Sequence, residues 1–302
     1  MKFTLDIPLG VIAPPGEFQS PDAVREMAQA LETAGAAACF VTDHPAPSAT
    51  WLHANGHDAP DPFTALAFAA AATTRLRLHT NILVLPYRNP FITAKAAATL
   101  QVFSGGRLIL GVGAGYQQAE FAALGVDFTR RGVLMDEALE TIKLAWNGGA
   151  VVKTGRNFDA AGNEPRPAPR PQPAVWIGGG SDKAVERAAR WGDGWSPFFT
   201  APTLSANNRA SAIQDVAHLR EKIAVLRDLR AELGRTGPFD IVIAAQAQVR
   251  EATRAEADRY LQAVGVLAEA GVNWISAGLP HPSRAAYLES AQWFGEEVIV
   301  RA

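Results

Sequence analysis

Asp43 and His44 are adjacent residues that could do acid–base chemistry, and they follow the apolar run "AACFVT". Such a run is typical of a buried strand, so the pair falls at a strand end. Histidine changes its charge near neutral pH and can donate or accept a proton there. A structural histidine bonded to the backbone is the alternative, and the pair alone does not separate the two interpretations.

Two glycine-rich segments could hold a large cofactor. They are Gly111 to Tyr116 in "RLILGVGAGY" and Gly178 to Ser181 in "AVWIGGGS". Bare backbone allows main-chain N–H groups to approach a flat, phosphate-bearing molecule, and a helix after Ser181 would direct its N-terminus at an anion. Tight turns without any ligand also use glycine, so either segment alone is a moderate signal.

The first glycine segment is not a dinucleotide fingerprint. That fingerprint needs Gly-x-Gly-x-x-Gly, and Tyr116 stands here at the sixth position. Its strand normally opens the βαβ unit, whereas three strand–helix units precede it in this chain. We therefore do not expect a Rossmann site.

The sequence gives little support for a metal site or for the common hydrolase motifs. His53, His57, Asp58 and Asp61 lie in the loop-like stretch "WLHANGHDAPD", which lacks a clear ligand set, so we expect no metal. No carboxylate pair, Gly-x-Ser-x-Gly or phosphate-binding P-loop is present, which argues against a glycosidase, a serine hydrolase and a nucleoside triphosphatase. The lone Cys39 is expected to be a buried strand residue.

The composition of the chain argues against nucleic acids and membranes as binding partners. The 302 residues carry a formal net charge of −2, with 48% hydrophobic and 19% charged residues. No basic field is available for a nucleic-acid backbone, and no apolar run approaches the roughly 20 residues of a membrane span. The beginning of the sequence does not resemble a signal peptide. We expect a cytoplasmic protein that binds neither nucleic acid nor membrane.

Strand and helix patterns alternate along the chain. Strands are expected at 3–10, 37–44, 75–86, 107–115, 174–181, 193–199, 239–249 and 272–280, with helices between them that include 61–73, 92–103 and 209–233. Eight strand–helix units in this length favour a (β/α)₈ TIM barrel, of the α/β class and formed by a single domain over 1–302, over an open doubly wound sheet. A hairpin (151–162) and a proline-rich connector (165–173) would be insertions; the connector could also be an interdomain linker.

The active site of such a barrel lies at the C-terminal ends of its strands. These ends contribute few acids and many glycine, aromatic and apolar residues. Candidates for the substrate side are Trp51, Trp195, Phe198 and His281.

Long blocks of the chain resemble the luciferase-like monooxygenase superfamily. They are "SGGRLILGVGAGYQQAEFAALGVDFTRRGVLMDEALETIKLAW", with "FVTDHP" and "TNILVLPYRNP" before it and "PAVWIGGGSDKAVERAARWGDGW" after it. The residues of these blocks are most similar to the branch of the superfamily that depends on the deazaflavin coenzyme F420, and less similar to the FMN-dependent monooxygenases. The resemblance implies a TIM barrel with the cofactor across the C-terminal mouth, and a homodimer.

The resemblance also implies site roles. Asp43 would contact the cofactor and His44 would act as a catalytic acid, base or polarising group. A bulge after the third strand, often with a non-prolyl cis peptide, falls at Asn81-Ile82. The further cofactor and phosphate contacts would be Gly113, Ala114, Gly115, Tyr116, Gly178, Gly179, Gly180 and Ser181.

At one position the sequence departs from the pattern of the F420-dependent branch, and this limits which reactions the resemblance implies. The F420-dependent sugar-phosphate dehydrogenases place a glutamate acid/base where this chain has Tyr116, which argues against their reaction here. The leading expectation is hydride transfer between F420 and an unidentified small organic molecule. The alternatives are an FMN-dependent monooxygenase that uses O₂ with a separate flavin reductase, and a homologue that binds flavin or another ligand without turnover.

Overall fold

The computed structural model describes residues 1–11, 14, 16–54, 56–201 and 212–302. The strands are β1 (Lys2–Asp6), β2 (Ala38–Val41), β3 (Arg77–Thr80), β4 (Leu83–Val84), β5 (Leu108–Gly113), β6 (Val151–Thr154), β7 (Asp159–Asn163), β8 (Ala174–Gly178), β9 (Gly194–Ser196), β10 (Asp240–Ala244) and β11 (Trp274–Ala277). The helices are α1 (Pro21–Thr33), α2 (Ala49–Ala54), α3 (Pro62–Ala72), α4 (Pro90–Phe103), α5 (Gln118–Ala123), α6 (Arg131–Trp146), α7 (Asp182–Trp191), α9 (Val216–Glu232), α10 (Arg254–Glu269) and α11 (Arg284–Glu297).

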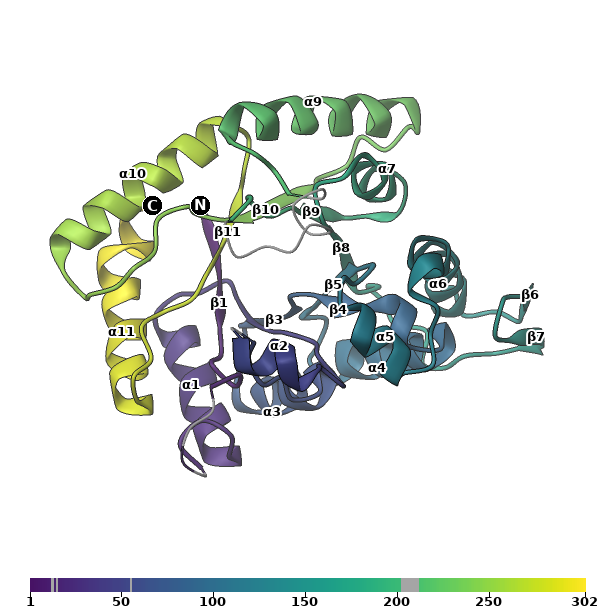
Figure 1. Cartoon of the computed structure of the whole chain (residues 1–302), viewed down its shortest axis with the longest axis horizontal. Helices are drawn as coiled ribbons and strands as arrows, with labels where there is room; N and C mark the ends of the chain where they lie inside the picture. Colours follow the sequence, from purple (N-terminus) through teal and green to yellow (C-terminus); the bar gives the residue numbers. More distant parts are fainter. Residues whose placement is uncertain (12–13, 15, 55, 202–211) are drawn as a thin grey trace.

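Parallel strands close into a barrel. β1, β2, β3, β5, β8, β9, β10 and β11 pair in parallel in this order, and β11 pairs with β1. The larger helices surround these strands (Figure 1). The (β/α)₈ barrel predicted from the alternating pattern is therefore confirmed, and the strand ends meet at one mouth.

The third predicted strand is interrupted rather than continuous. β3 ends at Thr80, the peptide bond between Asn81 and Ile82 is cis, and the short β4 resumes the pairing, with Leu83 opposite Val112 of β5. This bulge turns the chain toward β5 at the barrel mouth.

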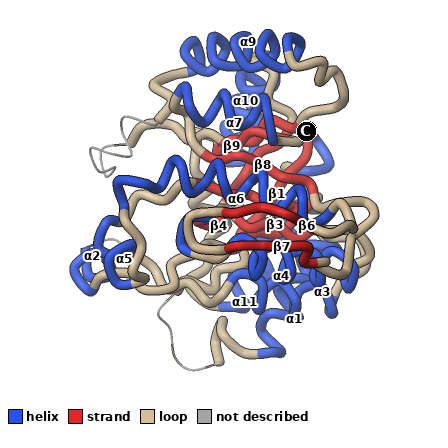
Figure 2. Tube along the Cα trace, turned by 90° about the vertical axis from the view of Figure 1, so that its right-hand side faces the viewer, coloured by secondary structure: helices blue, strands red, loops and turns tan. Residues whose placement is uncertain are grey.

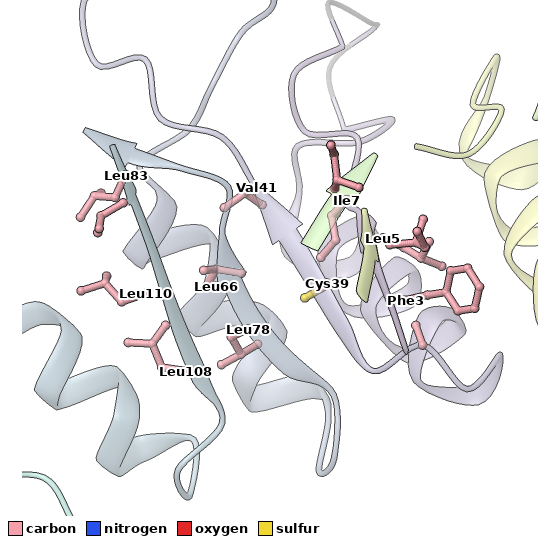
Figure 3. Packing of buried hydrophobic residues seen from close by; sticks show 14 of the residues in the cluster. Phe3, Leu5, Ile7, Cys39, Val41, Leu66, Leu78, Leu83, Leu108 and Leu110 are labelled. Carbon is pink, nitrogen blue, oxygen red and sulfur yellow. The ribbon is translucent and has the colours of Figure 1, made fainter. Parts of the chain in front are cut away.

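The core lies between the strands and the helices. Leu66 of α3 packs among side chains of β2 and β3, such as Val41 and Leu78, in one buried cluster (Figure 3). Burial of one such side chain stabilises the fold by about 1.5–3 kcal/mol. Many such contacts together hold the strands, and therefore the strand ends, in place.

Some boundaries differ from the sequence predictions. The long helix predicted over 209–233 begins only at Val216, because the Asp215 carboxylate caps it by accepting a hydrogen bond from the His218 N–H. Residues 209–211 of that prediction lie outside the described residues. The short helix α2 occupies a segment expected to be a loop, and the short helix α5 lies where no element was predicted.

Two insertions leave the barrel. β6 and β7 form the expected antiparallel hairpin, which projects away from the barrel (Figures 1 and 2). The proline-rich connector contains cis peptides before Pro167 and Pro171. The Arg170 guanidinium ties it to the end of α6 by donating to the carbonyls of Trp146 and Asn147. Among the described helices, none has both the length and the hydropathy to cross a bilayer.

Candidate active site

A cavity of about 300 Å³ opens at the carboxyl ends of the strands; we call it the His44 cavity. Its wall is formed by the segments that follow β2 and β3, by the ends of β4, β5 and β8, and by the helices α6 and α7. Its lining includes most of the predicted site residues, namely Asp43, His44, Asn81, Ile82, Gly113, Ala114, Gly115, Tyr116, Gly178, Gly179, Ser181 and Phe198. Residues that lie far apart in the sequence therefore share one hollow.

Some predicted residues lie elsewhere. Trp195 is fully buried, and its indole N–H donates to the Gly179 carbonyl at 2.7 Å. Trp195 therefore supports the loop that contains Gly179, and we do not propose it as a substrate contact. Gly180 is also buried outside the lining. Trp51 does not line the cavity, but its ring lies 4.5 Å from that of His44 between centroids.

The imidazole of His44 is held by a buried glutamate. Its Nδ1 lies 3.2 Å from Oε2 of Glu120, whose side chain is inaccessible to solvent. The Ala46 N–H donates to Oε1 at 2.9 Å, and the Tyr87 hydroxyl donates to Oε2 at 2.8 Å. Glu120 thus has partners on both oxygens, and it joins the segment after β2 to α5.

This network determines the charge of the glutamate. Burial alone would raise the pKa of the Glu120 carboxyl, but hydrogen bonds from His44, Ala46 and Tyr87 together lower it below the usual value. The carboxylate is therefore ionised at neutral pH. Nδ1 of His44 lies 3.2 Å from this carboxylate and also 3.2 Å from Nε2 of Gln117, and the negative charge of Glu120 favours a proton on Nδ1. Nε2 of His44 is left as the nitrogen that can exchange a proton with a bound molecule.

Asp43 is also fully engaged. The Arg88 guanidinium donates to both carboxylate oxygens, at 2.6 and 2.7 Å, and the Val84 N–H donates to Oδ2 at 2.9 Å. The Asp43 side chain is 1% exposed. This bidentate pair joins the end of β2 to the bulge and the turn that follows it. Asp43 lines the cavity, but its strongest contacts are made within the protein.

The glycines of β5 make room for the bulge. A Cβ at Gly111 would lie 2.2 Å from the Thr80 carbonyl oxygen, and one at Gly113 would lie 2.0 Å from Cδ1 of Ile82. Gly115 has a φ of +79°, in the left-handed region that favours glycine. The glycines of "RLILGVGAGY" are therefore required first by close approach of β3, Ile82 and β4, a reason that the sequence prediction did not include.

The other end of the cavity suits an anion. Gly179 has a φ of +98°, and Ser181 caps the ten-residue helix α7 by accepting a hydrogen bond from the Ala184 N–H. Arg187 of α7 lines the same cavity while it pairs with Asp136 at 2.6 Å. A helix N-terminus beside a guanidinium is the arrangement that binds phosphate.

Two further side chains lie beside His44. His57, whose ring centroid is 5.2 Å from that of His44, hydrogen-bonds through Nε2 to the Thr42 hydroxyl at 2.9 Å. Burial first, and the charge of His44 second, lower the pKa of His57, so it is neutral at pH 7. Tyr116 lies 6.0 Å away between ring centroids, and burial raises the pKa of its hydroxyl, which therefore stays protonated.

A second cavity of about 290 Å³ adjoins the first and shares Thr42 and His57 with it. We call it the Asp6 cavity, since Asp6 at the end of β1 and His281 after β11 line it. His281, predicted for the substrate side, thus lies here and not in the His44 cavity. Among the residues that the structure describes, no group of three or more His, Cys, Asp or Glu side chains could hold a metal ion.

The sequence prediction missed Glu120, Arg88, His57, Arg187 and Asp6. Arg187 lies on a predicted helix, where a charged residue usually faces solvent, and Glu120 lies in a segment for which no element was predicted, so their type gave no signal. Arg88 stands two residues before Pro90 in a segment read as a strand end. Glu120 stands four residues after Tyr116, a predicted cofactor contact, and this short separation is a signal that could have pointed to it.

Comparison with curated proteins finds relatives that match part of the chain. An uncharacterised protein of Mycobacterium tuberculosis is 34% identical over 179 residues, which cover 59% of this chain and 57% of that protein. The F420-dependent glucose-6-phosphate dehydrogenase of Kineococcus radiotolerans is 32% identical over 191 residues, covering 62% of this chain and 55% of the enzyme. The chain thus aligns with little more than half the length of these relatives.

The fold is shared over the whole length with solved structures. An F420-dependent secondary alcohol dehydrogenase in complex with an F420–acetone adduct superposes with a TM-score of 0.77 at 18% identity, covering 100% of this chain and 99% of that one. The sequence profile of the luciferase-like monooxygenase family matches residues 1–299. The chain belongs to the luciferase-like monooxygenase family.

Proposed function

We propose that the protein is an F420-dependent oxidoreductase that transfers a hydride between C5 of the deazaflavin and a small organic substrate. The observation that carries this proposal is the His44–Glu120 pair, whose histidine lines a cavity that also has bare glycine backbone and the N-terminus of α7 in its wall. The 32% identical F420-dependent relative supports the choice of cofactor.

The cavity fits a phosphate-bearing cofactor with a flat ring. Ile82 and the bare backbone of Gly113 and Gly178 form one wall, while the start of α7 and Arg187 offer donors to an anionic tail. The ring would therefore lie against the Asn81–Ile82 bulge, and the phosphate would lie near Ser181.

The protein's part in the reaction is positioning and proton transfer. When bound, the deazaflavin supplies the hydride chemistry. Glu120 holds Nδ1–H of His44, so Nε2 can take a proton from a substrate hydroxyl or return it to a carbonyl oxygen. Trp51 and Tyr116 pack around His44 and limit the access of water to it.

Tyr116 does not act as the base. Its raised pKa keeps the hydroxyl protonated, so it can donate a hydrogen bond but cannot accept a proton at neutral pH. This agrees with the departure from the sugar-phosphate dehydrogenases that the sequence showed, and it leaves His44 as the group that moves the proton.

The alternative is an FMN-dependent monooxygenase that uses O₂ and a flavin reductase partner, which is compatible with the description of the family as luciferase-like monooxygenases. A non-catalytic ligand-binding homologue is the second alternative, and the intact His44–Glu120 pair argues against it.

A fluorescence titration of the purified protein with F420 and with FMN separates these proposals. We expect binding of F420 in the micromolar range and weaker binding of FMN. Micromolar binding of FMN with none of F420 would overturn the cofactor assignment. A His44→Ala variant that retained full turnover with F420 would remove the proposed role of His44.

We also propose a homodimer through the outer face of α3 and α4. Phe68, Ile92 and Phe103 are large apolar side chains on these two contacting helices, and they are 48%, 68% and 83% exposed. Light scattering after size-exclusion chromatography should give twice the chain mass, and Phe103→Glu should shift the protein toward the monomer. A monomeric wild type would contradict this proposal.

A further inference from the structure

The Asp6 cavity carries an inference about the substrate. We propose that it binds a small, largely apolar, non-anionic molecule whose hydroxyl or amine donates a hydrogen bond to Asp6, and that it excludes anions. The proposal deepens the proposed function, on which it depends only for the reaction that this molecule undergoes.

The position of the cavity suits the substrate. It lies over the ends of β1 and β2, and Thr42 and His57 form the wall that it shares with the His44 cavity. The His57 ring is 5.2 Å from that of His44 between centroids. A molecule held here therefore lies next to the proton-transfer group but away from the glycine wall.

Asp6 has an acceptor with no partner. Its Oδ1 is buried and receives no hydrogen bond from the part of the chain that the structure describes. Tyr287 does not meet this need, because its hydroxyl donates to the main-chain carbonyl of Asp6 at 2.5 Å. Gly278 leaves space beside the carboxylate, since even a Cβ there would stop 3.5 Å from Oδ1.

An orphaned buried acceptor destabilises a fold by about 1–3 kcal/mol, so it requires a reason. Burial raises the pKa of the Asp6 carboxyl to about 6, although His281 and the Leu279 amide act in the opposite direction. At neutral pH the group is thus mostly an ionised acceptor. Oδ1 itself is closed to solvent, but the Asp6 side chain as a whole is half-buried and lines the cavity, so a hydroxyl or amine of a bound molecule can donate to its carboxylate.

His281 adds no anion-binding donor in its neutral form. Its Nδ1 lies 2.7 Å from the Leu279 carbonyl oxygen, so Nδ1 carries a proton and donates it there. Nε2 is then an acceptor too. Phe18 packs edge-on against the ring and keeps it in place.

The charges of the wall exclude anions. Among the described residues that line the cavity, the acidic ones are Asp6 and Asp58, and neither lysine nor arginine occurs. Ile7, Leu9 and Phe40 supply an apolar surface. A bound carboxylate or phosphate would meet like charge without a compensating cation, whereas the His44 cavity has Arg187 for that purpose.

Three probes of one shape test this inference: cyclohexanol, cyclohexylamine and cyclohexanecarboxylate. Their binding to the wild type, to Asp6→Asn and to the exposed control Asp22→Asn is measured by ligand-observed NMR at pH 7.5, and F420 is titrated into each protein in parallel. We expect the alcohol and the amine to bind at least ~10-fold more tightly than the carboxylate, a difference of about 1.4 kcal/mol.

Asp6→Asn should weaken the amine ~10-fold and the alcohol less, with F420 binding unchanged. Equal binding of the carboxylate, unchanged probe binding in Asp6→Asn, or no binding of the alcohol and the amine would each overturn the inference. If F420 fails to bind while the probes behave as expected, the proposed function fails and this inference stands.

Discussion

The two cavities at the barrel mouth differ in how their carboxylates are hydrogen-bonded. On the His44 side, Glu120 and Asp43 each have donors on both oxygens, and the pKa of Glu120 is lowered. On the other side, Asp6 keeps one oxygen without a partner, and its pKa is raised. A satisfied acid builds a fixed site, whereas an unsatisfied one leaves a contact for something that binds.

The largest effect should follow from breaking a satisfied pair. Arg88→Met keeps the aliphatic stem but leaves the Asp43 carboxylate buried without its cation, which should lower the free energy of unfolding by about 3–5 kcal/mol. Chemical denaturation measures it. Adding Asp43→Asn should recover part of the loss, because it removes the uncompensated charge; a double variant as unstable as Arg88→Met would contradict this account of the pair.

The next effect concerns the orientation of His44. Glu120→Gln keeps the size of the side chain but not its charge, and an amide can meet Nδ1–H with only one of its ends. We expect kcat to fall about 10–100-fold with little change in F420 affinity. The pH profile of kcat should shift as well, which a purely structural role would not cause. Tyr87→Phe, which removes another donor to Glu120, should cost much less activity.

The glycine wall gives a smaller, local effect. Gly113→Ala would bring a Cβ to 2.0 Å from Cδ1 of Ile82, so Ile82 must move, at a cost of about 1–3 kcal/mol. Cofactor affinity and Tm should both fall. Gly149→Ala, which meets no atom within 4 Å, is the control. Ile82→Val deletes Cδ1 and should restore much of the Gly113→Ala loss; no rescue would mean that another contact is responsible.

The smallest effect is the pH dependence of stability. The folded-state pKa of Asp6 is about 6, above the ordinary 3.8, so the folded protein binds the proton more tightly and this group's penalty appears as pH rises through 4–6. His281 and Tyr287 are the titratable groups close to it. Asp6→Asn should therefore raise Tm more at pH 8 than at pH 4.5, and an equal change at both pH values would refute the raised pKa.

Much of this picture could be predicted from the sequence. The alternation of strands and helices gave the barrel, and the residues at the strand ends gave His44 and the glycine loops. Glu120, Arg88 and Asp6 could not be found in this way, since their roles depend on which donors the closed barrel brings to them. Glu120 meets Ala46 across 74 positions of the chain, a contact that no local pattern encodes.

The assignment of the cofactor to one cavity and the substrate to the other is tested most directly by filling each in turn. Ala114 lines only the His44 cavity and Ala59 only the Asp6 cavity. F420 and cyclohexanol are titrated into Ala114→Phe and Ala59→Phe after both are shown to be folded. The account predicts that Ala114→Phe loses F420 and keeps the alcohol, and that Ala59→Phe does the reverse. Loss of F420 in Ala59→Phe, with retention in Ala114→Phe, would contradict it.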